Sequence, residues 1–79
     1  MELSPFLSMP NRKYLKEFVI HARKLRVEKK FSQADLARRL EKDKQSIQRF
    51  ESGKVNPTLL YLKDLADALD IPLKKFFDF

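Results

Sequence analysis

Residues 32–57, SQADLARRLEKDKQSIQRFESGKVNP, carry the local signals for two short helices joined by a tight connection. Ser32 begins the pattern S-Q-A-D, a variant of the capping box in which the Ser32 hydroxyl and the Asp35 carboxylate satisfy free amides at a helix start. Asp43 is a second N-cap, and its carboxylate interacts favourably with the positive end of the helix dipole. The predicted helices cover residues 33–40 and 44–52.

Helical periodicity continues on both sides of this stretch. After Asn11, a good N-cap residue, apolar residues recur with the i, i+3, i+4, i+7 spacing of one helix face, which predicts a helix over residues 12–29. Downstream, Thr58 can cap a fourth helix that runs to about residue 69, and Pro72 suits the first position of a short fifth helix. No segment alternates as a half-buried strand does, so the predicted fold class is all-α. Residues 1–11 are expected to form a flexible arm before a single domain over 12–79.

The net charge of +6 is concentrated in the first two-thirds of the chain. Residues 12–30 carry eight Lys or Arg side chains against two acidic ones, whereas residues 57–79 carry three basic and four acidic ones. Such asymmetry is typical of a domain that binds a polyanion. Lys-rich helices that are merely solvated would give the same count, so charge leaves both alternatives open.

The composition also excludes several classes of site. With no cysteine, the chain has no disulfides or thiolate zinc sites, and a reducing cytoplasm fits this composition. No apolar run approaches the length of about 18 residues that a membrane span needs. His21 is the sole histidine and is expected to be an ordinary surface residue. We find no phosphate-cradling glycine loop, no metal-ligand set and no nucleophile with a base partner, and therefore predict no enzyme activity, cofactor or metal.

The two helices flanking residue 42 form a helix-turn-helix unit. Ala37 is small where the two backbones must approach, and Ile47 and Phe50 supply the apolar inner side of the second helix. The outer side of that helix is basic and rich in amides, which suits hydrogen bonding to base edges in a major groove. A generic polar helix surface is the alternative. The outward residues are Lys44, Gln45, Gln48 and Arg49.

Residues 20–77 resemble the helix-turn-helix domain of the Cro/C1 (XRE) family, the fold of the lambdoid phage repressors. The resemblance implies a compact five-helix, lambda-repressor-like domain in which the second and third helices form the helix-turn-helix. The motifs that carry it are Ser32-Gln33, Leu36-Ala37, Ser46-Ile47, Glu51, Gly53-Lys54, Asn56-Pro57, Leu62, Leu65-Ala66 and Leu69.

The resemblance further implies a transcription regulator that binds a palindromic operator in double-stranded DNA as a homodimer, with no small-molecule substrate. It gives base contacts to Lys44, Gln45, Gln48 and Arg49. Contacts to the DNA backbone are assigned to Gln33, Ser52, Gly53 and Lys54. Gln33 is also expected to brace the first residues of the third helix. Arg38 and Arg39 are expected to be solvated, and Glu51 to pair with Arg23 or Arg26.

The C-terminal residues carry more apolar mass than one short helix can bury in its own core. We therefore predict a dimer interface containing Phe76, Phe77 and Phe79, with core packing as the alternative for Leu73 and Phe76. A protein-interaction module of the same fold, such as an antitoxin, remains the alternative function. It would place the functional surface on the arm around Phe6, Leu7 and Met9 or on the C-terminal aromatic residues.

Family members commonly place glycine at four helix ends, where this chain has Lys30, Glu41, Gly53 and Asp70. A left-handed backbone is therefore expected at all four positions. Gly53 then needs a separate explanation, because three positions manage without glycine. Either its loop approaches a DNA phosphate, or the loop is crowded against the first helix. Lys42 also departs from the family, which usually has an apolar residue beneath the turn.

Overall fold

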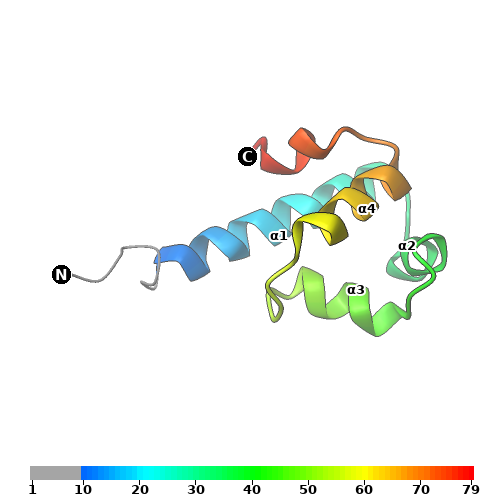
Figure 1. The fold of residues 1–79 in the computed structure, drawn as a ribbon, viewed down its shortest axis with the longest axis horizontal. Coiled ribbons are helices and arrows are strands. Elements are labelled where there is room, and N and C mark those ends of the chain that lie inside the picture. Colours follow the sequence, from blue (N-terminus) through cyan, green and yellow to red (C-terminus); the bar gives the residue numbers. More distant parts are fainter. Residues whose placement is uncertain (1–9) are drawn as a thin grey trace.

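Four α-helices and a C-terminal 3-10 helix form the part of the chain that the computed structural model describes, residues 10–79 (Figure 1). The all-α prediction is confirmed, although the fifth helix is 3-10 rather than α. No helix within this range has both the length and the apolar character needed to cross a bilayer. The elements are α1 (Pro10–Glu28), α2 (Gln33–Arg39), α3 (Lys44–Glu51), α4 (Leu59–Leu69) and η2 (Leu73–Phe77).

The N-terminal boundary differs from the prediction. Helix α1 begins at Pro10, so Asn11 lies inside the helix and its predicted role as N-cap is wrong. Proline suits a first helical position because its φ is preset and the missing N–H would have no intrahelical partner. The last two residues of the predicted arm, 10 and 11, are therefore helical. The rest of that arm, with Phe6, Leu7 and Met9, lies outside the described residues.

The predicted N-caps of the three following helices are confirmed. Ser32 and Asp35 form the reciprocal capping box, with both hydrogen bonds at 2.9 Å. The backbone N–H of Ser32 is the main cause that lowers the pKa of the Asp35 carboxyl below its ordinary value. Asp43 accepts from the Ser46 N–H at 2.8 Å and Thr58 accepts from the Tyr61 N–H at 3.1 Å. Local sequence therefore sets where α2, α3 and α4 start.

All four α-helices end in the same way. The backbone φ is positive at Lys30 (66°), Glu41 (54°), Gly53 (74°) and Asp70 (57°), as predicted. At each end the left-handed residue donates to the carbonyl three residues earlier, and the next residue donates to the carbonyl five residues earlier. This pair of hydrogen bonds defines the Schellman motif, which satisfies carbonyls that the helix leaves free. Only one of the four motifs uses the glycine that it favours.

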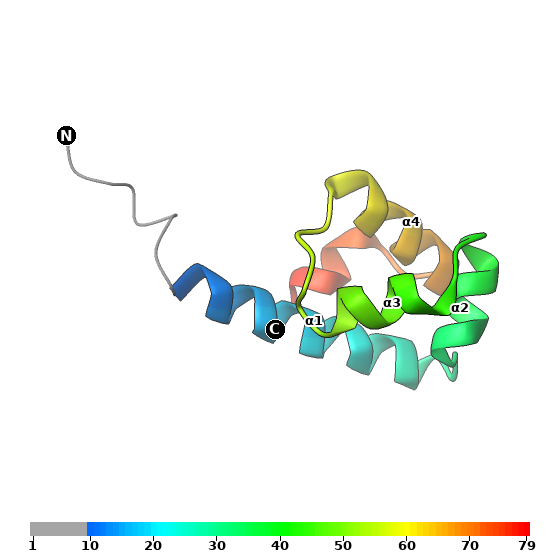
Figure 2. The same cartoon turned by 90° about the horizontal axis from the view of Figure 1, so that it is seen from below.

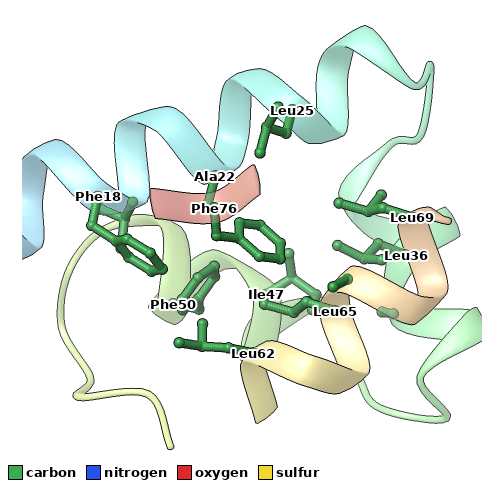
Figure 3. Packing of buried hydrophobic residues seen from close by; sticks show 13 residues of the cluster. Phe18, Ala22, Leu25, Leu36, Ile47, Phe50, Leu62, Leu65, Leu69 and Phe76 are labelled. Atoms are coloured by element: carbon green, nitrogen blue, oxygen red, sulfur yellow. The ribbon is translucent and has the colours of Figure 1, made fainter. Parts of the chain in front are cut away.

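The core lies between α1, α3 and α4 and is closed by α2 and η2 (Figure 3). Ile47 and Phe50 on α3 are 0% and 2% exposed, as their inward placement predicted. Phe76 on η2 is 1% exposed and packs 6.1 Å, centroid to centroid, from Phe18 on α1. Phe76 is therefore a core residue, and its predicted place in a dimer interface is wrong.

The C-terminal residues pack along α1 beside this core. The Phe77 ring lies 5.3 Å from Phe18, and the Phe79 ring lies 5.3 Å from Tyr14, measured between centroids. His21 on α1 joins this cluster, with its Nε2 2.8 Å from the Lys75 carbonyl oxygen. Phe77 and Phe79 nevertheless remain 47% and 49% exposed. About half of the surface of each residue is thus available to a further contact.

Candidate nucleic-acid interface

Helix α3 lies on the surface of the molecule, alongside α1 and with α2 at its N-terminal end (Figure 2). Because Ile47 and Phe50 are buried, the opposite side of the helix faces solvent. The structure confirms the orientation predicted for the four residues on that side, all of which are exposed. They are Lys44, Gln45, Gln48 and Arg49.

A buried ion pair fixes the C-terminal end of α3 against α1. The Arg26 guanidinium donates from Nε to Glu51 Oε2 at 2.6 Å and from Nη2 to Oε1 at 3.0 Å. Both side chains are less than 10% exposed. The third nitrogen, Nη1, donates to the Phe31 carbonyl at 2.7 Å, so Arg26 also holds the turn before α2. Of the two partners predicted for Glu51, the structure selects Arg26 rather than Arg23.

Gln33 joins this ion pair. Its Nε2 donates to Glu51 Oε1 at 2.9 Å. Gln33 therefore braces the last residue of α3, and the prediction that it braces the first residues is wrong. An amide nitrogen carries two hydrogens, so the second N–H of Gln33 can still donate to another acceptor.

Most of the residues predicted to contact DNA line one open hollow beside the end of α3. Three of its lining residues, Gln33, Ser52 and Lys54, were predicted to contact the DNA backbone. Two others, Gln48 and Arg49, were predicted to contact bases. Gln45 instead lines a second hollow, with Arg49 and the loop that precedes α4. Lys44 lines neither of these two hollows but is exposed at the start of α3.

The amides of the loop after α3 are already engaged. The backbone N–H groups of Ser52, Gly53 and Lys54 donate to carbonyls of α3 at 3.0–3.2 Å. The Ser52 hydroxyl donates to the Arg49 carbonyl at 3.1 Å. These hydrogen bonds end the helix, and they leave side chains such as Lys54 as the donors that this loop can offer to an outside anion.

Arg23 lines the same hollow, although its sequence position did not predict a place in the interface. A weak signal was present, since Arg23 precedes the buried Arg26 by three residues and so shares its side of α1. Its position beside α3 depends on how the two helices cross.

Two basic residues of the helix-turn-helix have structural roles. Arg39 is exposed, as predicted, and its Nη1 also donates to the Ala68 carbonyl on α4 at 2.8 Å, with its guanidinium 4.8 Å from the centroid of the Phe31 ring. Lys42 lies over the Tyr61 ring with its Nζ 5.9 Å from the centroid. Lys42 thus packs on an aromatic ring at the position where family members usually have an apolar side chain. Arg38 pairs with Asp35 on the exposed side of α2, which agrees with a solvated position.

A helix-turn-helix family model, HTH_3, matches residues 23–76. The chain therefore belongs to the Cro/C1-type (XRE) helix-turn-helix family of DNA-binding transcription regulators. Among solved structures, it is similar to the restriction-modification controller protein C.AhdI from Aeromonas hydrophila, with a TM-score of 0.79 and 33% sequence identity. The similarity covers 84% of this chain and 96% of C.AhdI. No curated protein sequence matches the chain.

Proposed function

We propose that the protein is a sequence-specific transcription regulator that binds a palindromic operator as a homodimer. The observation that supports this proposal most is the outward side of α3, where four basic or amide side chains are exposed on a helix whose opposite side is buried in the core. The similarity to a restriction-modification controller protein favours a regulator over an interaction module.

The proposed roles follow from the chemistry of these side chains. Lys44 and Gln45, at the N-terminal end of α3, reach base edges first, and Gln48 and Arg49 follow one turn later. Lys and Arg can donate to guanine O6 and N7, and Gln can pair with adenine through two hydrogen bonds. Lys54 and the second N–H of Gln33 bind phosphates, which fix the register of α3 in the groove.

A homodimer would present two copies of α3 to one face of the duplex. Half-sites read in this way are about 34 Å apart, one helical turn of DNA. The proposed interface comprises the exposed halves of Phe77 and Phe79. Joining two weak half-sites raises the affinity through the second, effectively intramolecular, contact.

Selection of bound sequences from a random duplex pool tests this proposal. We expect enrichment of an inverted repeat whose half-sites are about 10 base pairs apart, centre to centre. Enrichment of a single unrepeated site would contradict the homodimer, and no enrichment at all would contradict sequence-specific recognition.

Two sets of variants test the assigned roles. Lys44→Ala and Gln45→Ala should change which bases are enriched. Lys54→Ala should weaken binding to all sequences alike and reduce the slope of log affinity against log salt by about 0.9. The reverse pattern would show that α3 enters the groove in a different register.

A further inference from the structure

Three basic residues of α1 share one side of the helix. Arg12, Lys16 and Arg23 are spaced i, i+4, i+11, which places them within a narrow angular range at 3.6 residues per turn. All three are exposed. Val19 lies on the same side and is buried, so this side of α1 also meets the core.

This basic side of α1 adjoins the end of α3. A Cβ built on Gly53 would lie 3.9 Å from Val19 Cγ2 and 4.0 Å from Lys16 Cγ, so Lys16 lies directly beside the loop that follows α3. Arg23 lines the hollow that also contains Gln48 and Lys54. The basic residues of α1 are therefore continuous with the proposed phosphate contacts.

Helix α1 carries this side beyond the helix-turn-helix. Figure 1 shows the N-terminal end of α1 extending beyond the end of α3. From Arg23 to Arg12 the helix rises about 16 Å, because each residue adds about 1.5 Å. This length is enough for more than one phosphate of a DNA strand, since charges on one strand are about 3.4 Å apart along the duplex axis.

Within the part of the chain that the structure describes, the charges on this side of α1 are not neutralised. In residues 10–79, none of Arg12, Lys16 and Arg23 forms an ion pair with a carboxylate. The two acidic residues of α1, Glu17 and Glu28, fall on another side of the helix by the same periodicity.

We infer that Arg12, Lys16 and Arg23 form a second phosphate-binding surface, which contacts the duplex backbone next to the half-site that α3 reads. The inference rests on the proposed function and adds residues to it. The family match begins at residue 23, so Arg12 and Lys16 precede the matched region. The surface binds any sequence, because a phosphate contact carries no direct base information.

A pair of charge-matched variants tests this surface. Arg12→Gln/Lys16→Gln removes two charges from it, and Lys13→Gln/Lys24→Gln removes two charges from a different side of α1. Affinity for a fluorescent random-sequence duplex of about 30 base pairs is measured across a salt series. We expect the first variant to reduce the salt slope by about 0.9 for each phosphate that it no longer neutralises, whereas the second stays close to the unmodified protein. Circular dichroism checks that both variants retain their helices.

Selection from the random pool supplies a second measurement. Arg12→Gln/Lys16→Gln should enrich the same sequence as the unmodified protein, and a changed sequence would contradict a phosphate-only contact. Equal loss of slope in the two variants would assign the effect to net charge and overturn the inference. If the salt slope is unchanged in Arg12→Gln/Lys16→Gln, this inference is wrong but the proposed function is not affected. Failure of the unmodified protein to bind the duplex at about 50 mM salt would overturn both.

Discussion

Gly53 is the only glycine in the chain, and the structure removes one of the two explanations for it. An added Cβ would meet Val19 at 3.9 Å, an ordinary van der Waals distance, so crowding against α1 is wrong. The amides of its loop donate to α3, which weakens the argument that glycine frees them for a phosphate. The positive φ of 74° remains as a sufficient cause.

We therefore predict that Gly53→Ala lowers the free energy of unfolding by about 1 kcal/mol, the cost of a left-handed residue with a side chain. Urea denaturation measures this change. Lys30→Gly is the matched control at the end of α1, and it should leave stability unchanged or raise it. DNA affinity should stay close to that of the unmodified protein. A large loss of affinity with unchanged stability would instead support close approach of a phosphate to Gly53.

Tyr61 gives a second prediction at this scale. Its hydroxyl is buried, and no hydrogen-bond partner for it exists in the described part of the chain. Burial raises the pKa of this hydroxyl and the charge of Glu51 adds to the rise, whereas the Ser46 side chain, whose geometry is not that of a hydrogen bond, offsets only part of it. Tyr61→Phe keeps the edge-to-face contact with Phe50, whose ring centroid is 5.4 Å away, and removes the unsatisfied group. We expect unfolding stability to be unchanged or higher by up to about 1 kcal/mol. A clear loss of stability in urea denaturation would show that the hydroxyl has a partner.

At the scale of elements, one ion pair decides how α3 is presented. Arg26, Glu51 and Gln33 connect α1, the end of α3 and the start of α2 through three hydrogen bonds of 2.6–3.0 Å. Since the Arg26 and Glu51 side chains are both buried, removing one partner leaves the other charge uncompensated. The orientation of the proposed DNA-reading side of α3 thus depends on a buried ion pair behind it.

We predict that Glu51→Gln lowers the free energy of unfolding by about 3 kcal/mol or more, as for other broken buried ion pairs. Denaturant titration followed by circular dichroism measures this loss. The double variant Arg26→Met/Glu51→Met should recover part of it, because no uncompensated charge remains. If Glu51→Gln alone is nearly neutral, water or another group satisfies Arg26 in solution.

The elements show what sequence can and cannot predict. The starts of α2 and α3 were predicted correctly because Ser32 and Asp43 cap them through neighbours three residues away. The outward side of α3 followed from periodicity in the same way. The partner of Gln33 was missed because Glu51 is 18 residues distant and meets it only through the packing of α2 on α3. Phe76 was misplaced because apolar content alone does not show which C-terminal ring enters the core.

The whole molecule has an uneven distribution of charge. Arg12, Lys16 and Arg23 of α1 and the basic residues of α3 lie around the proposed DNA surface, whereas exposed Asp64, Asp67 and Asp70 lie on α4 or at its end. A duplex would therefore be attracted more strongly to the side of α1 and α3 than to the side of α4. Such a field raises association rates and favours one docking orientation.

Among the apolar side chains that residues 10–79 expose are two groups, at the C-terminal end and at the start of α4, and only the first was expected. Phe77 and Phe79 are each about half exposed. Leu59 and Leu60 at the start of α4 are 67% and 75% exposed, although the inner side of α4 is formed by later residues. A homodimer that buries either surface links folding to association, so its stability depends on protein concentration.

We predict that the melting temperature rises by about 4 °C for each tenfold increase in protein concentration, as expected for a dimer of this size whose subunits unfold on dissociation. Differential scanning calorimetry at several concentrations measures this dependence. Phe77→Asp/Phe79→Asp should abolish it, and Leu59→Asp/Leu60→Asp should preserve it. The concentration dependence is the deciding measurement, because Phe77 also packs on Phe18 and its loss lowers the melting temperature of the monomer itself. If the Leu59→Asp/Leu60→Asp variant loses the concentration dependence and the Phe77→Asp/Phe79→Asp variant keeps it, the dimer interface lies at the start of α4. A melting temperature that does not depend on concentration in the unmodified protein would contradict a homodimer coupled to folding.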